Sequence, residues 1–453
     1  MQRSLTSMVS ALALIAGLGF AQAAQAETTI MTTVDFWDDV TVETTTAALA
    51  TGIDINAIDD NGYSALIRAG NEGASAEVVQ FLLDNGADVN QIGHDGRPPF
   101  FWVSKGGDLA ALDVLLSANP DLDVLDDTKR NAYAHATRAQ TDPAVYARLV
   151  EIGIDPMLLD ENGRSALHEA AQRTPSVELL AFLHEQGLAY DTLDNDGMNV
   201  VLNAAYRNPY LDVVQFLAEH ADVTLTDANG NNAVLLAAVR NPSVEVLDFL
   251  LAQGLSAEGV NAEGRNAIAL AAENDAAVMQ RLIDLGLDVN LADANGETPL
   301  VIAAAENEPG IVGVLLMSGK VDIEMSGAAA LHEALSHGDE NGQTNALLLL
   351  EAGVDAATLK DNGDTALTVA ANADQPVDLL RALIESGADV NAVDSNGMTA
   401  LLHYAATSGN ADAIRFLVEA GADTTAADSF GDTVADMVSD NAKLAGSDVI
   451  GLF

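Results

Sequence analysis

Residues 160–171 read DENGRSALHEAA, and stretches of the same form return throughout the chain. A polar tetrapeptide that ends in glycine comes first, and a short alanine-rich helical segment follows it. Glycine after Asp-x-Asn permits the positive φ angle of a tight turn, while the Asp and Asn side chains satisfy nearby backbone amides. The tetrapeptide recurs at 59–62, 194–197, 227–230, 293–296, 394–397 and 428–431.

The turn glycines recur at a nearly constant interval. From Gly62 to Gly431 there are 369 residues in 11 intervals, about 33.5 residues each, and Lys129 fills the one position that lacks a glycine. A second helical segment follows each alanine-rich one, with apolar residues three and four apart, such as Val244 and Leu247. One helix pair cannot bury its own apolar faces, so neighbouring pairs must stack into one elongated core.

The repeat period, the turn sequence and the two helical segments resemble those of the ankyrin repeat family. The resemblance covers nearly the whole chain after residue 26. Residues 298–300 (TPL), 166–168 (ALH) and 330–332 (ALH) are versions of the family's Thr-Pro-Leu-His element, and Gly-Ala-Asp-Val-Asn occurs at 86–90 and 387–391. The resemblance implies an all-α fold. The expected architecture is an ankyrin-repeat solenoid of paired short antiparallel helices with β-turn or hairpin fingers.

The first residues have the features of a secretory signal peptide. Arg3 precedes an uncharged apolar run from Met8 to Phe20, and the small residues at 21–26 offer cleavage sites. The run is too short for a comfortable membrane span. We therefore expect cleavage before Glu27 and a mature protein in the periplasm or outside the cell, with no membrane insertion.

The repeats also predict how the chain is divided. We expect a signal peptide at 1–26, a partial N-terminal capping repeat at 27–58, an array of about 11 repeats at 59–427, and a C-terminal capping repeat at 428–453. Within the N-terminal cap, Val42–Ala50 is expected to form an outer helix.

The least regular stretch is 317–345. Counting Gly327 as a turn glycine makes one interval short and the next one long. Residues 339–342 (DENG) then look like an insertion between two helices. We predict a local bend or looser stacking there.

Composition excludes several classes of function. The chain has 19 Lys and Arg against 68 Asp and Glu, a net charge of −49, which disfavours nucleic acid and anionic membranes as partners. It has no cysteine, which excludes disulfides, thiolate metal sites and cysteine catalysis.

The sequence offers little catalytic chemistry. His332 and His337 are five residues apart, whereas a zinc-binding helix needs four. An EF-hand loop aligned on Gly197 has Asn203 where Glu is required. No nucleophile elbow, phosphate-binding loop or dinucleotide fingerprint is present. We expect no metal and no cofactor, and the resemblance implies that His168 and His332 stabilise their turns.

The resemblance implies recognition of other proteins through the turn tips and the inner helices. Alignment on the alanine pairs predicts that basic and aromatic residues of the inner helices face outward. Trp102 is the best candidate for an anchor, whereas Phe100 belongs to the core. These surface candidates are Arg68, Trp102, Lys105, His135, Arg138, Arg173, Tyr206, Arg207 and Arg240.

Two interpretations of this basic stripe stay open. It could bind an acidic partner, or its arginines could pair with the many neighbouring carboxylates. The sequence favours a monomeric, exported, non-enzymatic scaffold that binds another protein. The alternatives are a secreted effector that acts on a host or competitor protein, and a hydrolase or metal-dependent enzyme that uses the irregular stretch.

Overall fold

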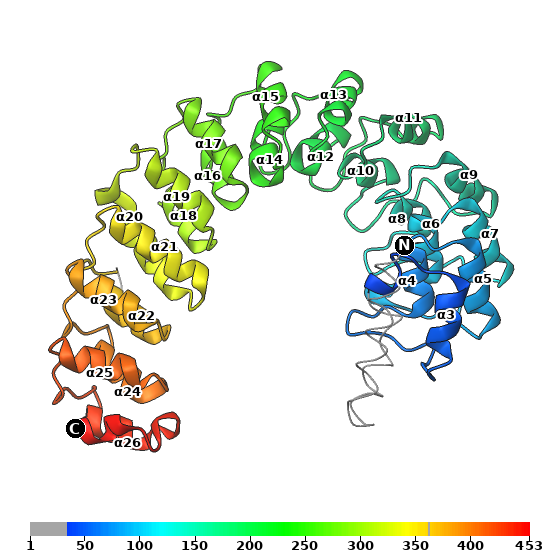
Figure 1. Ribbon diagram of the computed structural model, residues 1–453. Coiled ribbons are helices and arrows are strands. Elements are labelled where there is room, and N and C mark those ends of the chain that lie inside the picture. Colours follow the sequence, from blue (N-terminus) through cyan, green and yellow to red (C-terminus); the bar gives the residue numbers. More distant parts are fainter. Residues whose placement is uncertain (1–33, 361–362) are drawn as a thin grey trace. The chain divides into compact units, whose positions relative to one another are not determined.

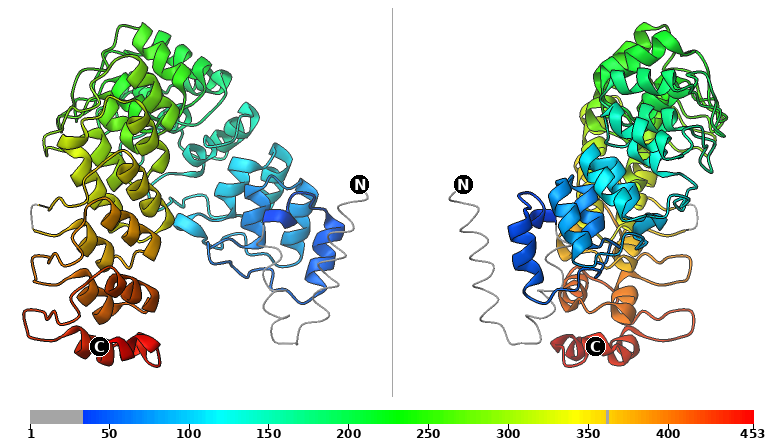
Figure 2. Two further views of the ribbon diagram at one scale, coloured as in Figure 1. Left: turned by 60° about the vertical axis from the view of Figure 1, so that its left-hand side comes forward. Right: turned by 90° about the vertical axis from the view of Figure 1, so that its right-hand side faces the viewer.

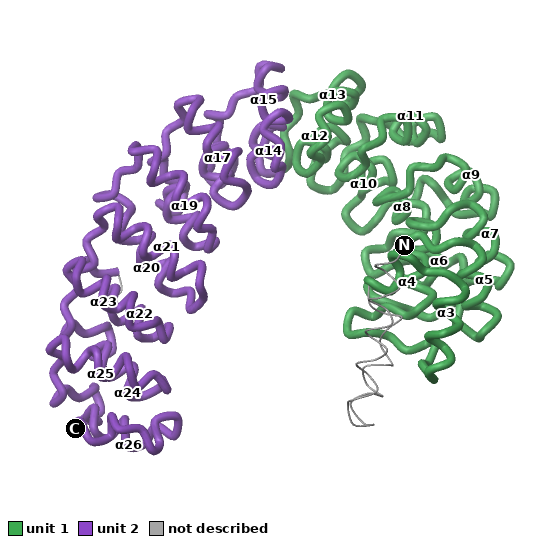
Figure 3. Tube along the Cα trace, in the orientation of Figure 1, with its two compact units in different colours: residues 1–228 green, residues 229–453 purple. Residues whose placement is uncertain are grey.

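The computed structural model describes residues 34–360 and 363–453, so the predicted signal peptide lies outside the described residues. The described chain is built from α-helices, with isolated β-bridges at some fingers and no named strand. The helices come in pairs, and the first (inner) helix of each pair directly follows a turn. Two compact units divide the chain, unit 1 up to Ala228 and unit 2 from Asn229 (Figure 3).

In unit 1 each inner helix packs on the next inner helix, as α4 does on α6 and α6 on α8 (Figure 1). The inner helices are α4 (Ala65–Asn71), α6 (Pro99–Gly106), α8 (Ala132–Ala136), α10 (Ala166–Ala171) and α12 (Val200–Arg207). The outer helices are α3 (Val42–Leu49), α5 (Ala76–Asp84), α7 (Leu109–Ser117), α9 (Pro143–Glu151), α11 (Val177–Glu185) and α13 (Leu211–His220). Short 3₁₀ turns lie at η2 (Val34–Phe36) and η3 (His94–Gly96).

Unit 2 repeats this arrangement, and its last pairs stay stacked in both views of Figure 2. Its inner helices are α14 (Ala233–Arg240), α16 (Ala267–Leu270) with η4 (Ala271–Glu273), α18 (Pro299–Ala305), α20 (Ile323–Ser336), α22 (Ala366–Asn372), α24 (Ala400–Thr407) and α26 (Val434–Asp440). Its outer helices are α15 (Val244–Ala252), α17 (Ala276–Asp284), α19 (Pro309–Met317), α21 (Glu340–Glu351), α23 (Val377–Glu385) and α25 (Ala411–Glu419).

The two ends of the array differ from its interior. At the N-terminal end, helix α3 packs on the outer helix α5 and ends at its C-cap residue, Ala50. The sequence predicts an outer helix at this place. At the C-terminal end, α26 packs on the inner helix α24, and the 3₁₀ turns η5 (Ala442–Leu444) and η6 (Asp448–Leu452) follow it in place of a second α-helix. Within residues 34–360 and 363–453, both ends therefore contain less than a full helix pair.

In most fingers the aspartate that begins the tetrapeptide accepts backbone N–H groups of the turn. Asp160 Oδ1 accepts the N–H groups of Asn162 and Arg164 at 2.9 and 2.8 Å, and Gly163 has the positive φ angle that the turn requires. Lys129 takes the corresponding position in another finger with φ +66°. The sequence prediction that Lys129 replaces a turn glycine is therefore confirmed.

Side-chain amides join successive repeats. The Asn208 amide donates to the carbonyls of Ala171 and Thr174, both at 2.9 Å, in the preceding repeat. In unit 2, the Asn274 amide makes the same kind of bond to the carbonyl of Asn241, at 3.0 Å. These bonds satisfy carbonyl groups at and beyond the ends of the inner helices, which lack partners within their own helix.

Small residues let the inner helices approach closely. A Cβ atom added at Gly70 in α4 would lie 2.6 Å from the backbone nitrogen of Val103 in α6. Ala170 and Ala171 of α10 are fully buried. The low aromatic fraction of the chain follows from this close packing.

The irregular stretch differs from the sequence prediction. Gly327 is buried inside helix α20 and is not a turn glycine, because Asp322 caps that helix five residues earlier by accepting the Met325 N–H at 3.1 Å. Residues 339–342 are not an insertion between helices, because Asp339 caps α21 and accepts the Gly342 N–H at 2.9 Å. No finger separates α19 from α20, and the local bend stays a prediction.

Candidate binding surface

The first residue of the predicted stripe, Arg68, is paired within its own repeat. Its guanidinium lies 2.9 Å from Asp59 Oδ2 and 4.1 Å from the centre of the Tyr63 ring. The side chain is buried. For this residue the structure favours the second interpretation, in which the arginine pairs with a neighbouring carboxylate.

Trp102 and His135 do not face outward, which corrects the sequence prediction. Trp102 is only 5% exposed, with its ring 5.2 Å from that of His135 and its flanks covered by Tyr63 and Lys105. His135 is fully buried, and burial lowers its pKa well below the ordinary value, with the charges of Arg97 and Arg138 acting in the same direction. The predicted anchor and the predicted basic histidine are therefore a buried ring pair beneath the surface, where burial favours the neutral form of His135.

Four other predicted residues form a row that we call the inner-row cations: Lys105, Arg138, Arg173 and Arg207. All are half-buried, and each lies at or just beyond the C-terminal end of α6, α8, α10 or α12. The negative end of a helix dipole favours a cation at such a place. The sequence prediction that these four reach the surface of the inner helices agrees with their exposure.

Few carboxylates compensate the inner-row cations. Lys105 Nζ donates to Asn71 Oδ1 at 2.7 Å, and Arg138 Nε lies 3.6 Å from Glu169 Oε2. Among the described residues, Arg173 and Arg207 form no ion pair. Burial and the charges of Arg138 and Arg207 lower the pKa of Arg173 to about 10. The row is therefore short of negative charge.

The last two predicted residues lie beside this row or outside unit 1. Tyr206 is half-buried in α12, next to Arg207. Arg240 is exposed at the end of α14 in unit 2, so we leave it out of the inner-row cations.

The sequence analysis missed a second set of arginines, directly after the turn position of several fingers. They bridge fingers: Arg97 Nη2 lies 2.9 Å from Asp126 Oδ2 of the next finger, and Arg265 Nε lies 2.9 Å from Asp293 Oδ2 in unit 2. The sequence signal that could have identified these arginines is the basic residue directly after the turn position, at 97, 130, 164 and 265.

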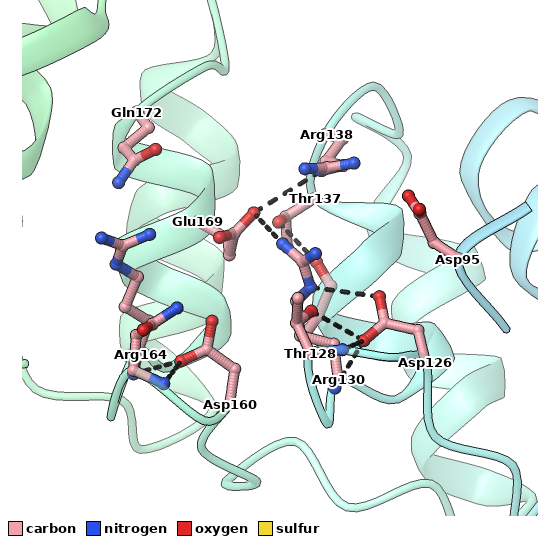
Figure 4. A network of polar contacts seen from close by, with 12 residues as sticks. Asp95, Asp126, Thr128, Arg130, Thr137, Arg138, Asp160, Arg164, Glu169 and Gln172 are labelled. Carbon is pink, nitrogen blue, oxygen red and sulfur yellow. Dashed lines mark hydrogen bonds and ion pairs between the residues drawn. The ribbon is translucent and has the colours of Figure 1, made fainter. Parts of the chain in front are cut away.

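Glu169 links the finger arginines to the inner-row cations (Figure 4). Its Oε2 atom lies 3.1 Å from Arg130 Nη1 and 3.6 Å from Arg138 Nε. Arg130 in turn contacts Asp126, at 3.2 Å. Glu169 is buried and its direct ion pairs are with these two arginines, while its charge also favours the charged form of Arg173 from a greater distance.

Several histidines form hydrogen bonds that serve the fold. His168 Nδ1 lies 2.8 Å from Ser165 Oγ and Nε2 lies 2.9 Å from the Thr192 carbonyl oxygen, which agrees with the role expected in the turn. His332 is buried, and His337 Nε2 bonds to the Ala305 carbonyl at 2.9 Å. The described residues contain no group of three or more side chains placed to hold a metal ion.

One His–Asp pair has the hydrogen-bond geometry of a catalytic dyad. His403 Nε2 lies 2.9 Å from Asp394 Oδ2, beside a hollow of about 250 Å³ in unit 2. The same aspartate position contacts the residue nine places later in other repeats, since Asp194 accepts from Asn203 and Asp59 from Arg68. The pair is therefore a version of a structural contact that other repeats make with an asparagine or an arginine.

The comparisons with known proteins agree with this architecture. The family described as "Ankyrin repeats (3 copies)" matches residues 201–293, 270–356 and 331–428, and the family "Ankyrin repeat" matches residues 61–94. The chain belongs to the ankyrin repeat family. Ankyrin repeats indicate a scaffold for protein–protein interaction, and no helix of the described residues is long and apolar enough to cross a membrane.

Two ankyrin repeat proteins illustrate the similarity, and each of them covers part of this chain. The ankyrin repeat protein YahD of Escherichia coli (strain K12) is 40% identical over 74 residues, which are 16% of this chain and 36% of that protein. The solved ankyrin repeat domain of Bcl-3, a member of the IkappaB protein family, is 24% identical with a TM-score of 0.38, covering 46% of this chain and 94% of that domain.

Proposed function

We propose that this ankyrin repeat protein is an exported, non-enzymatic scaffold that binds another protein through the inner-helix surface of unit 1. The observation that carries the proposal is the row of half-buried cations Lys105, Arg138, Arg173 and Arg207 in a chain of net charge −49. In the part of the chain that the structure describes, the row has one ion pair with a carboxylate, between Arg138 and Glu169. Such a surface favours an acidic partner, because complementary charge speeds encounter and excludes wrong partners.

The experiment is affinity capture from an extract of the cell envelope. The mature protein is compared with a variant in which all four inner-row cations are changed to Glu. We expect the variant to lose most of the captured partner, a drop of at least about tenfold in affinity. Capture that is unchanged in a folded variant would contradict a binding site on this surface.

A control variant on the outer helices tests the effect of overall charge, with half of the charge change of the four-residue variant. Arg148, in the outer helix α9, pairs with Asp113 and Glu151 at 2.8 Å each, and Arg281 in α17 pairs with Asp248 at 2.7 Å. A variant with Glu at both positions makes the chain more acidic without touching the inner row. We expect it to capture the partner as the wild-type protein does.

Export is tested separately. N-terminal sequencing of the protein recovered from periplasm and medium is expected to begin at Glu27. Recovery from the medium alone would favour the secreted effector, and an intact Met1 on a protein confined to the cytoplasm would contradict export.

A further inference from the structure

The inner-row cations follow the repeat, one to each of four successive inner helices. The intervals between Lys105, Arg138, Arg173 and Arg207 are 33, 35 and 34 residues. Packed helices lie about 8–10 Å apart. The four charges therefore recur along unit 1 at about that distance.

The inner-row cations lie close enough to one another that their positive charges repel. Burial and the charge of Arg138 lower the pKa of Lys105. Burial and the charge of Arg130 lower the pKa of Arg138, and Arg138 and Arg207 act on Arg173. A bound anion with charges spaced like the row would relieve this repulsion at every position.

We propose that the inner-row cations bind an acidic α-helix of the partner whose Glu or Asp side chains recur every seven residues along one face. This inference rests on the proposed function, since it names the structure that the scaffold recognises. Seven residues of α-helix advance about 10.5 Å and return to nearly the same face. In an extended chain, residues on one face lie about 6.6 or 13 Å apart, so its carboxylates match the row poorly.

The spacing also favours carboxylates over a polyanion. Double-stranded nucleic acid carries one charge per ~1.7 Å, far denser than the row. The remainder of this very acidic chain repels such a density of negative charge.

Glu169 limits the affinity of this surface for an acidic helix, because its Oε2 atom already lies 3.6 Å from Arg138 Nε. Glu169→Gln keeps a hydrogen-bond acceptor near Arg130 and Arg138 and removes the competing charge. We expect this change to tighten the binding of an acidic helix. Because most changes to a binding site weaken binding, a gain is an unusually specific outcome.

The test uses two synthetic peptides of roughly 28 residues and equal composition, built on a helical Ala/Gln framework. The first carries one Glu for each inner-row cation, at heptad spacing on one face. The second carries the same Glu residues distributed around the helix. Their affinities for the mature full-length protein are measured by fluorescence anisotropy at low salt, where exposed charges are least screened, and inorganic polyphosphate serves as competitor.

We expect the heptad peptide to bind about tenfold more tightly than the redistributed one. Arg173→Gln with Arg207→Gln should remove that preference, Glu169→Gln should strengthen binding, and Arg148→Gln should leave it unchanged. Equal affinities of the two peptides, or tighter binding of polyphosphate than of the heptad peptide, would overturn the inference. Circular dichroism confirms that each variant is folded.

The outcomes separate this inference from the proposed function. If envelope capture depends on the inner-row cations but the peptides do not differ, the scaffold stands and the acidic helix is wrong. If capture does not depend on the inner-row cations, the binding surface itself is wrong.

Discussion

Arg97 Nη2 of one finger lies 2.9 Å from Asp126 Oδ2 of the next, and the two side chains are 3% and 0% exposed. The pair joins two repeats through a buried charge contact. Arg130 approaches the same aspartate oxygen at 3.2 Å. In unit 2, Arg265 and Asp293 form the corresponding bridge at 2.9 Å. Fingers of this protein are thus tied together by ion pairs as well as by backbone hydrogen bonds.

Breaking the bridge should be costly. Asp126→Asn removes the buried carboxylate that Arg97 and Arg130 share, and leaves Asp95 and Glu169 as their remaining acidic partners. We therefore expect the free energy of unfolding to fall by about 2 kcal/mol. Urea denaturation followed by circular dichroism measures this. Asp113→Asn, which removes an exposed partner of Arg148, should cost less than about 1 kcal/mol. Equal losses in the two variants would refute the buried bridge.

Acid should weaken the same bridge. Burial raises the pKa of Asp126, but hydrogen bonds from the Arg130 N–H and the Thr128 hydroxyl, together with the guanidinium charges, outweigh it and hold the pKa below its ordinary value. A carboxylate whose pKa is lower in the folded state stabilises the fold at pH values above its unfolded pKa of about 4. This stabilisation is lost as the pH falls below that value. The urea midpoint should therefore drop between pH 5 and pH 3, and less steeply in Asp126→Asn. An identical slope in both proteins would contradict this.

His135 should make the fold sensitive to mild acid. It is fully buried, and neither ring nitrogen has a hydrogen-bond partner among the described residues. Since burial lowers its pKa, its contribution to stability is present above the unfolded value of about 6.5 and is lost as pH falls below it.

Replacing that ring with an apolar side chain should help. His135→Leu removes the unpartnered nitrogens and should raise the free energy of unfolding by about 1 kcal/mol at pH 7, and by more at pH 5.5. Thermal unfolding at the two pH values measures the difference. A variant that is less stable at both values would show that the ring is needed for packing against Phe101 and Trp102.

The lysine in a turn position carries backbone strain. Lys129 has φ +66°, a region that glycine adopts without cost. Lys129→Gly should raise the free energy of unfolding by about 1 kcal/mol. The reverse change, Gly296→Ala, meets no atom within 4 Å but introduces the same strain at φ +87°, so it should lower the free energy by a similar amount. Urea midpoints that move the same way in both variants would disprove the argument.

Much of this fold could be predicted from the sequence. The interval between turns, the Asp-x-Asn-Gly pattern and the alanine pairs predicted the helix pairs, and Lys129 was predicted in its turn. Gly327 misled the prediction, because the interval alone does not distinguish a turn glycine from one that allows close packing of a helix. The helix cap at Asp322, five residues earlier, decides between the two.

The candidate surface was predicted only in part. Alignment on the alanine pairs identifies which residues leave the inner helix, and it placed the inner-row cations correctly at the surface. It gives no information about what a neighbouring finger covers. Tyr63 and Arg97 come from fingers and contact the Trp102 ring, so the exposure of Trp102 depends on residues 39 and 5 positions earlier in the sequence.

The most direct test of the binding surface is photo-crosslinking in living cells. A photoreactive amino acid replaces Tyr206, half-buried in the inner helix α12, or Gln215, exposed in the outer helix α13 of the same repeat. A partner bound to the inner-helix surface predicts a covalent adduct from position 206 that is absent when the inner-row cations are changed to Glu, and no adduct from position 215. An adduct from position 215 with none from position 206 would contradict the account.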